Sequence, residues 1–131
     1  IQGRLPAGCQ LVENPHWNRT DPFASLVLGL KRTSAKSILV TPVDTPPATT
    51  EELSRLLAQP HTAVLSWHEK AGHPVLLRAD VLTRIHAGEQ PNHGLRSFLE
   101  DAHHVPAETS AAITSWNTLE QWQTWHDSTS A

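Results

Sequence analysis

The apolar residues of one segment near the start of the chain follow helical spacing. Phe23, Leu26, Val27 and Leu30 recur at positions i, i+3, i+4 and i+7. The dipeptide Asp21-Pro22 precedes them, and it supplies an N-cap followed by proline at the first helical position. The pattern therefore predicts a helix that begins at this dipeptide.

Short apolar runs bounded by turn residues predict strands. Residues 37–43 (SILVTPV) have no clean alternation, which is typical of a strand buried on both faces of a parallel sheet. Residues 62–67 and 75–78 flank the loop 69–72, so we expect them to form a hairpin with a longer loop. Weaker strands are predicted at residues 8–13, near Val105 and at residues 111–114.

Four more segments carry helix signals. Thr49 and Glu52 form a capping box for a helix that stops before Pro60, and Thr118 and Gln121 form one for the last helix. The inner faces of the four helices are Leu53, Leu56 and Leu57; Val81, Leu82 and Ile85; Leu95, Phe98, Leu99 and Ala102; and Leu119, Trp122 and Trp125.

Strands that alternate with helices predict an α/β domain with a mainly parallel sheet flanked by helices. At 131 residues we expect one domain over residues 1–126 and a flexible tail over 127–131. The net charge of -3 argues against a nucleic-acid partner, and no apolar run is long enough to cross a membrane. Cys9 is the single cysteine, which suits a reducing, cytoplasmic compartment.

Asp44 is the first candidate for chemistry. It follows a predicted buried strand and precedes a Thr-Pro-Pro turn. Ligands of open α/β sheets bind beyond the carboxyl ends of the strands, where a carboxylate can hold Mg²⁺ together with nucleotide phosphates. The alternative is that Asp44 only starts the turn.

Four segments in order give the chain a family resemblance: residues 14–17 (NPHW) with 23–26 (FASL) and 29–30 (GL), residues 40–47 (VTPVDTPP), residues 72–77 (GHPVLL) and residues 116–122 (WNTLEQW). Together they resemble the cytidylyltransferases and guanylyltransferases that act on the molybdenum cofactor. The resemblance runs from about Leu11 to Trp125. It implies a nucleotidyltransferase fold of the nucleotide-diphospho-sugar transferase type.

The resemblance also implies site residues. Asp44 matches the aspartate that coordinates Mg²⁺ on the nucleotide phosphates, which makes it both a metal ligand and a catalytic residue. His73 lies in the segment on the acceptor side of the cleft and is the second catalytic candidate. Ser25 matches a serine near the base and ribose, and Asn117 lies near the active site. From the residues alone, His73 can instead be a loop histidine before a strand, and Asn117 a helix start.

The chain also departs from the family. Members begin with a strand and a glycine-rich loop whose amides, arginine and lysine hold the triphosphate, and no such segment precedes Asn14. The chain also begins at Ile1 and contains no methionine. We therefore expect an N-terminally truncated domain that is inactive or weak by itself and that self-associates through the surfaces left uncovered.

The implied reaction transfers CMP or GMP from CTP or GTP to a phosphorylated pterin-type acceptor, with Mg²⁺ as cofactor. Two alternatives stay open. One is a non-catalytic binding or assembly module that retains the fold, and the other is a sugar-phosphate nucleotidyltransferase or glycosyltransferase relative. The spacing of the nine histidines does not predict a zinc site.

Overall fold

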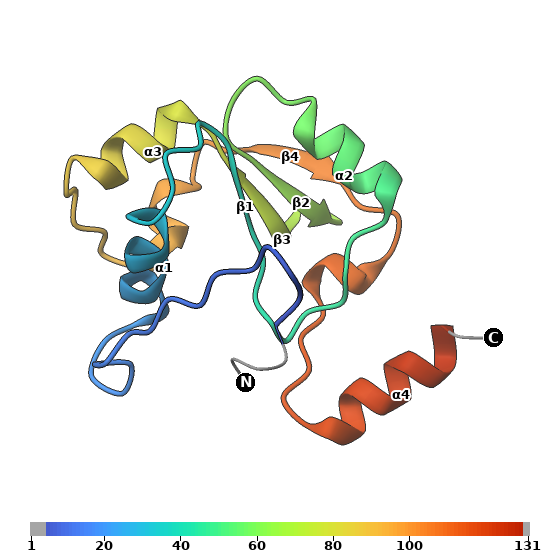
Figure 1. The fold of residues 1–131 in the computed structure, drawn as a ribbon. Helices are drawn as coiled ribbons and strands as arrows, with labels where there is room; N and C mark the ends of the chain where they lie inside the picture. Colours follow the sequence, from blue (N-terminus) through green and yellow to red (C-terminus); the bar gives the residue numbers. More distant parts are fainter. Residues whose placement is uncertain (1–4, 130–131) are drawn as a thin grey trace.

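A computed structural model of the chain describes residues 5–129. Its sheet contains four strands in the order β1-β3-β2-β4 (Figure 1). Their bounds are Ile38–Val40 for β1, Ala63–Trp67 for β2, Lys70–Leu77 for β3 and His103–Pro106 for β4. β3 is antiparallel to both β1 and β2, whereas β2 and β4 are parallel.

The sheet is therefore mixed, and the prediction of a mainly parallel sheet is wrong. The predicted hairpin is confirmed, since β2 and β3 pair with each other. Its predicted longer loop is wrong, because β3 already begins at Lys70 and only two residues separate the strands. This hairpin inserts β3 between β1 and β2, so one of the three strand pairs among the described residues is parallel. β1, β2 and β4 nevertheless run in the same direction.

Within residues 5–129, four α-helices and two short 3-10 helices accompany the sheet. They are α1 (Pro22–Leu30), α2 (Thr50–Leu57), α3 (Ala79–His86), α4 (Leu119–Thr129), η2 (Gly94–Phe98) and η3 (Ser110–Ile113). The predicted caps of the first two are confirmed: the Asp21 side chain accepts from the N–H of Ala24, and Thr49 and Glu52 form a complete capping box.

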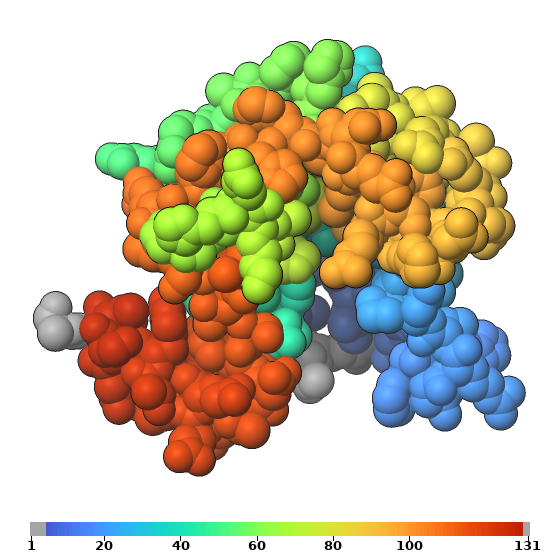
Figure 2. Space-filling model, turned by 180° about the vertical axis from the view of Figure 1, so that it is seen from behind, coloured from blue at the N-terminus to red at the C-terminus, as the bar shows by residue number. Residues whose placement is uncertain are grey.

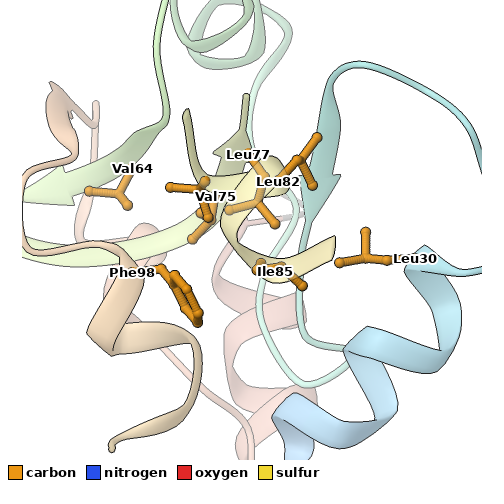
Figure 3. Packing of buried hydrophobic residues seen from close by; sticks show 8 residues of the cluster. Leu30, Val64, Val75, Leu77, Leu82, Ile85 and Phe98 are labelled. Carbon is orange, nitrogen blue, oxygen red and sulfur yellow. The ribbon is translucent and has the colours of Figure 1, made fainter. Parts of the chain in front are cut away.

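The two faces of the sheet carry separate apolar clusters. One joins the sheet to α1, α3 and η2 (Figure 3): Leu30, Val64, Val75, Leu77, Val81, Leu82, Ile85 and Phe98. The other joins it to α2 and η3: Leu56, Ala63, Leu65, Leu76, Val105 and Ala112. Neighbouring residues of β2 enter opposite clusters because side chains alternate along a strand.

Several local predictions are wrong. Residues 8–13 form no strand, and residues 111–114 are largely η3, which the Thr109 side chain caps at the N–H of Ala111. The stripe from Leu95 begins a 3-10 helix instead of an α-helix. β1 is an edge strand, so Leu39 is 39% exposed and not buried on both faces.

Helix α4 reaches Thr129, so the first residues of the expected tail are helical, and residues 130–131 lie outside the described part of the chain. Among residues 5–129, no helix is long and apolar enough to span a membrane.

Candidate active site

The strand directions gather distant segments at one edge of the sheet. β1, β2 and β4 all end there, and β3 begins there, because β3 alone runs the other way. The loop after β1 carries Asp44, the first half of β3 carries His73, and η3 follows β4. Three segments that are far apart in the sequence thus meet beside Asp44.

Local hydrogen bonds hold the loop that carries Asp44. The Thr45 hydroxyl donates to the carbonyl of Pro42 (3.0 Å) and lies 3.3 Å from the hydroxyl of Thr41. The backbone N–H of Trp116 donates to the carbonyl of Asp44 at 2.7 Å. The C-terminal segment therefore fixes the backbone of this loop from outside it.

Glu52 anchors the end of the same loop at the start of α2. One carboxylate oxygen accepts from the N–H of Thr49 (2.9 Å) and the other from the N–H of Glu108 (2.8 Å). The side chain is buried, with 5% of its residue surface exposed. It joins the loop after β1 to the segment after β4, which a capping box alone does not require.

The side chain of Asp44 is left available. The residue is half-buried, and its carboxylate takes part in no hydrogen bond with the described residues. It acts on the imidazole of His73 through its charge. A carboxylate with this freedom can accept a cation or a hydrogen-bond donor of a ligand.

His73 is in an apolar setting. Burial lowers the pKa of His73, and the negative charge of Asp44 offsets part of that effect. The imidazole is therefore neutral at neutral pH. Its Nδ1 atom is buried and has no hydrogen-bond partner among the described residues.

A hollow of about 570 Å³ opens beside His73. Phe23 and Leu26 of α1 and Leu95 of η2 supply apolar lining, and Pro42 lines it from the loop after β1. A predominantly apolar hollow with a few polar groups is the usual form of a small-molecule site. Figure 2 shows the surface recessed between the blue segment that contains α1 and the red C-terminal segment, and the C-terminal segment does not line the hollow beside His73.

The structure does not bring all four predicted residues together. The charge of Asp44 acts on the imidazole of His73, although Asp44 does not line the hollow beside that imidazole. Asn117 directly follows Trp116, whose N–H donates to the Asp44 carbonyl. Ser25 is exposed on α1, and it lines a different hollow from His73. The hydroxyl oxygen of Ser25 accepts a hydrogen bond from the amide of Asn14 at 3.0 Å.

Sequence reasoning missed two contributors to this site, Trp116 and the second role of Glu52. The capping box of Glu52 was visible as a local motif, but its contact with Glu108 joins positions far apart in the chain. Trp116 acts through its backbone N–H, which no residue pattern can indicate.

A comparison with known protein families shows to which family this chain belongs. Residues 3–107 match the family described as the MobA-like NTP transferase domain, and the chain belongs to this family. The family confirms the resemblance seen in the sequence and implies a nucleoside triphosphate as substrate. No significant match was found among curated proteins or among solved structures.

Proposed function

We propose that this chain takes part in transferring a nucleoside monophosphate from CTP or GTP to a phosphorylated pterin-type acceptor. An acceptor phosphate oxygen forms a bond to the α-phosphorus of the nucleotide, and the bond from that phosphorus to the departing pyrophosphate breaks. The observation that carries the proposal is the free, half-buried carboxylate of Asp44 at the edge where three strands end.

Asp44 suits a magnesium ion that is shared with a nucleotide. Mg²⁺ prefers oxygen ligands and is often held by one or two carboxylates, with waters and phosphates completing the shell. Among the described residues, no group of three His, Cys, Asp or Glu forms a site made of protein ligands alone. A bound Mg²⁺ would neutralise charge on the phosphates.

The other predicted residues take supporting roles in this proposal. The neutral imidazole of His73 borders the larger hollow, where it can exchange a hydrogen bond with the acceptor. Asn117 lies at the start of the last helix beside the Asp44 loop, and Ser25 contacts the nucleoside. The 131 residues contain no glycine-rich phosphate loop, so we expect slow turnover by this chain alone.

Calorimetry with Mg²⁺ and CTP or GTP tests the role of Asp44. Asp44→Asn keeps the size of the side chain and removes its charge, so the magnesium-dependent part of the binding heat is expected to disappear. Asp101→Asn is the matched control, because Asp101 is exposed and its side chain makes no hydrogen bond to any residue that the structure describes. Equal heats for wild type and Asp44→Asn would remove the metal role.

A further inference from the structure

The segment after β4 contacts the candidate site through backbone N–H groups. The N–H of Glu108 donates to the buried carboxylate of Glu52 at 2.8 Å, and the N–H of Trp116 donates to the carbonyl of Asp44 at 2.7 Å. The C-terminal segment therefore supports the loop after β1 and the start of α2 at two points. Of the two hydrogen bonds, the one from Trp116 reaches the residue that carries the candidate metal ligand.

The side chain of Trp116 packs against α4. The centroid of its ring lies 5.1 Å from that of Trp125, and the two ring planes are tilted by 57°. Aromatic pairs at this separation attract each other beyond the area that they bury. Figure 1 shows α4 set apart from the sheet, and none of its residues that the structure describes is buried. The contact with Trp125 therefore ties an otherwise exposed helix to the residue that holds the Asp44 loop.

The position of the Trp116 ring depends on this contact. Its Nε1 atom is buried and has no hydrogen-bond partner among the described residues. A buried donor without an acceptor is unfavourable, because the same N–H would bind water if it were exposed. Turning the ring outward would satisfy this donor, and the packing against Trp125 opposes that turn. Without Trp125, we expect the ring to turn outward and the backbone N–H of Trp116 to lose its alignment with the Asp44 carbonyl.

The first turn of α4 couples the helix to Trp116 along the chain. The side-chain oxygen of Gln121 accepts from the N–H of Asn117 at 2.6 Å, and the N–H of Gln121 donates to the hydroxyl of Thr118 at 3.1 Å. Asn117 directly follows Trp116. A displacement of α4 is therefore passed on to Trp116 both through the ring contact and through the backbone.

We propose that Trp125 is a positioning residue for Asp44: its ring holds Trp116 in place, and the N–H of Trp116 fixes the backbone from which the carboxylate extends. Mg²⁺ demands near-ideal octahedral geometry, so its affinity depends on where a carboxylate ligand is held. Groups that orient a metal ligand from outside the coordination shell affect metal affinity by tenfold or more. The inference rests on the proposed function, in which Asp44 is the metal ligand, and it adds a residue of α4 to the supports of that ligand.

Trp122 provides a matched control in the same helix. It is half-buried like Trp125, but its ring stacks on His126 of α4 itself, with the ring centroids 4.9 Å apart. Trp122→Ala therefore removes an indole from α4 without removing the contact with Trp116. Trp125→Phe is the conservative variant, because it keeps an aromatic ring at the contact.

Hydrogen exchange followed by NMR tests the contact without metal or nucleotide. The N–H of Trp116 is the donor to Asp44, so it exchanges with solvent when that hydrogen bond opens. Trp125→Ala should speed its exchange about tenfold, whereas Trp122→Ala and Trp125→Phe should leave it close to wild type. The amides of β2 and β3 should keep their rates in all these variants, which separates a local effect from a loss of global stability.

Calorimetry with Mg²⁺ and CTP or GTP tests whether this positioning matters for Asp44. Trp125→Ala should weaken the magnesium-dependent binding about tenfold, and Trp125→Phe should restore most of it. Trp122→Ala should bind like wild type.

Two results would overturn the inference. One is a wild-type exchange rate for the N–H of Trp116 in Trp125→Ala. The other is equal magnesium-dependent affinity in Trp125→Ala and Trp122→Ala when Asp44→Asn has lost that binding. If Asp44→Asn instead keeps the magnesium-dependent heat, the proposed function fails, and the exchange rates alone decide whether Trp125 positions the loop.

Discussion

Gly72 lies so close to Ala112 that a Cβ atom at position 72 would overlap the carbonyl of Ala112. The contact brings η3 against the first half of β3, one residue before His73. Gly72→Ala must push the two backbones apart, and we expect it to lower the free energy of unfolding by about 1–3 kcal/mol in urea denaturation.

Gly29→Ala is the matched control for this substitution. Gly29 lies inside α1, and a Cβ atom there would meet no atom within 4 Å outside its own helix backbone and chain neighbours. Alanine favours the helix over glycine, so this variant should gain about 0.5–1 kcal/mol. If both variants gained stability, the close approach of η3 to β3 would be wrong.

The turn between β2 and β3 holds two non-glycine residues in the left-handed region. The φ angles of His68 and Glu69 are 49° and 66°, which are values that a two-residue hairpin turn needs and that glycine adopts without strain. After allowing for the greater freedom of glycine in the unfolded chain, Glu69→Gly should raise the free energy of unfolding by about 0.5–1 kcal/mol. Thermal unfolding followed by circular dichroism measures the change, and a lower midpoint would contradict this conformation.

Glu52 accepts hydrogen bonds from two backbone N–H groups of separate segments. In Glu52→Gln, the amide NH₂ must face one of these donors and cannot accept its hydrogen, so about 1–3 kcal/mol of stability should be lost. Glu51→Gln changes the exposed neighbour in the same helical turn and serves as the control. Similar unfolding midpoints for the two variants would show that Glu52 does not bridge the segments.

Local signals in the sequence predicted the elements better than their arrangement. The caps Asp21 and Thr49 and the hairpin all depend on residues within a few positions of one another, and all three are confirmed. The insertion of β3 between β1 and β2 depends on long-range pairing. An apolar run such as residues 37–43 does not indicate which strand will pair with it, or that it will pair on one side only.

The candidate site shows the same division. The turn after β1 made Asp44 a candidate, and the family match supports the class of chemistry. The contact of Trp116 with Asp44 and the separation of Ser25 from His73 arise from how the C-terminal segment and α1 pack on the sheet. These are tertiary contacts between segments that share no periodic pattern.

The free edge of β1 provides a test of the predicted self-association. Within the described residues, β1 pairs with β3 alone, and Leu39 is 39% exposed at this edge. Unpaired strand edges with apolar side chains favour pairing with another chain, and charged side chains oppose it. We expect light scattering to show concentration-dependent association that Leu39→Lys reduces and Leu119→Lys, on the exposed part of α4, does not. A wild-type monomer at all concentrations would contradict the expectation.

Asp80 makes the stability of the fold depend on pH, and a single substitution of Asp80 isolates this dependence. Its carboxylate accepts from the hydroxyl of Thr62 (2.6 Å), the N–H of Thr62 (3.2 Å) and the N–H of Val81 (3.1 Å). Burial raises the pKa of Asp80, but these hydrogen bonds outweigh that effect and leave the pKa below its ordinary value.

Because the folded state lowers this pKa, the ionised carboxylate stabilises the fold above the pKa of the unfolded chain, and this contribution is lost as the pH falls through the folded value. Asp80→Asn should therefore melt below wild type at pH 7. The difference between the melting temperatures of the two proteins should stay constant down to about pH 4.5 and shrink in more acidic solution. Asp101→Asn should melt at the same temperature as wild type at each pH. A difference between wild type and Asp80→Asn that is the same at pH 7 and pH 3 would mean that the charge of Asp80 does not contribute.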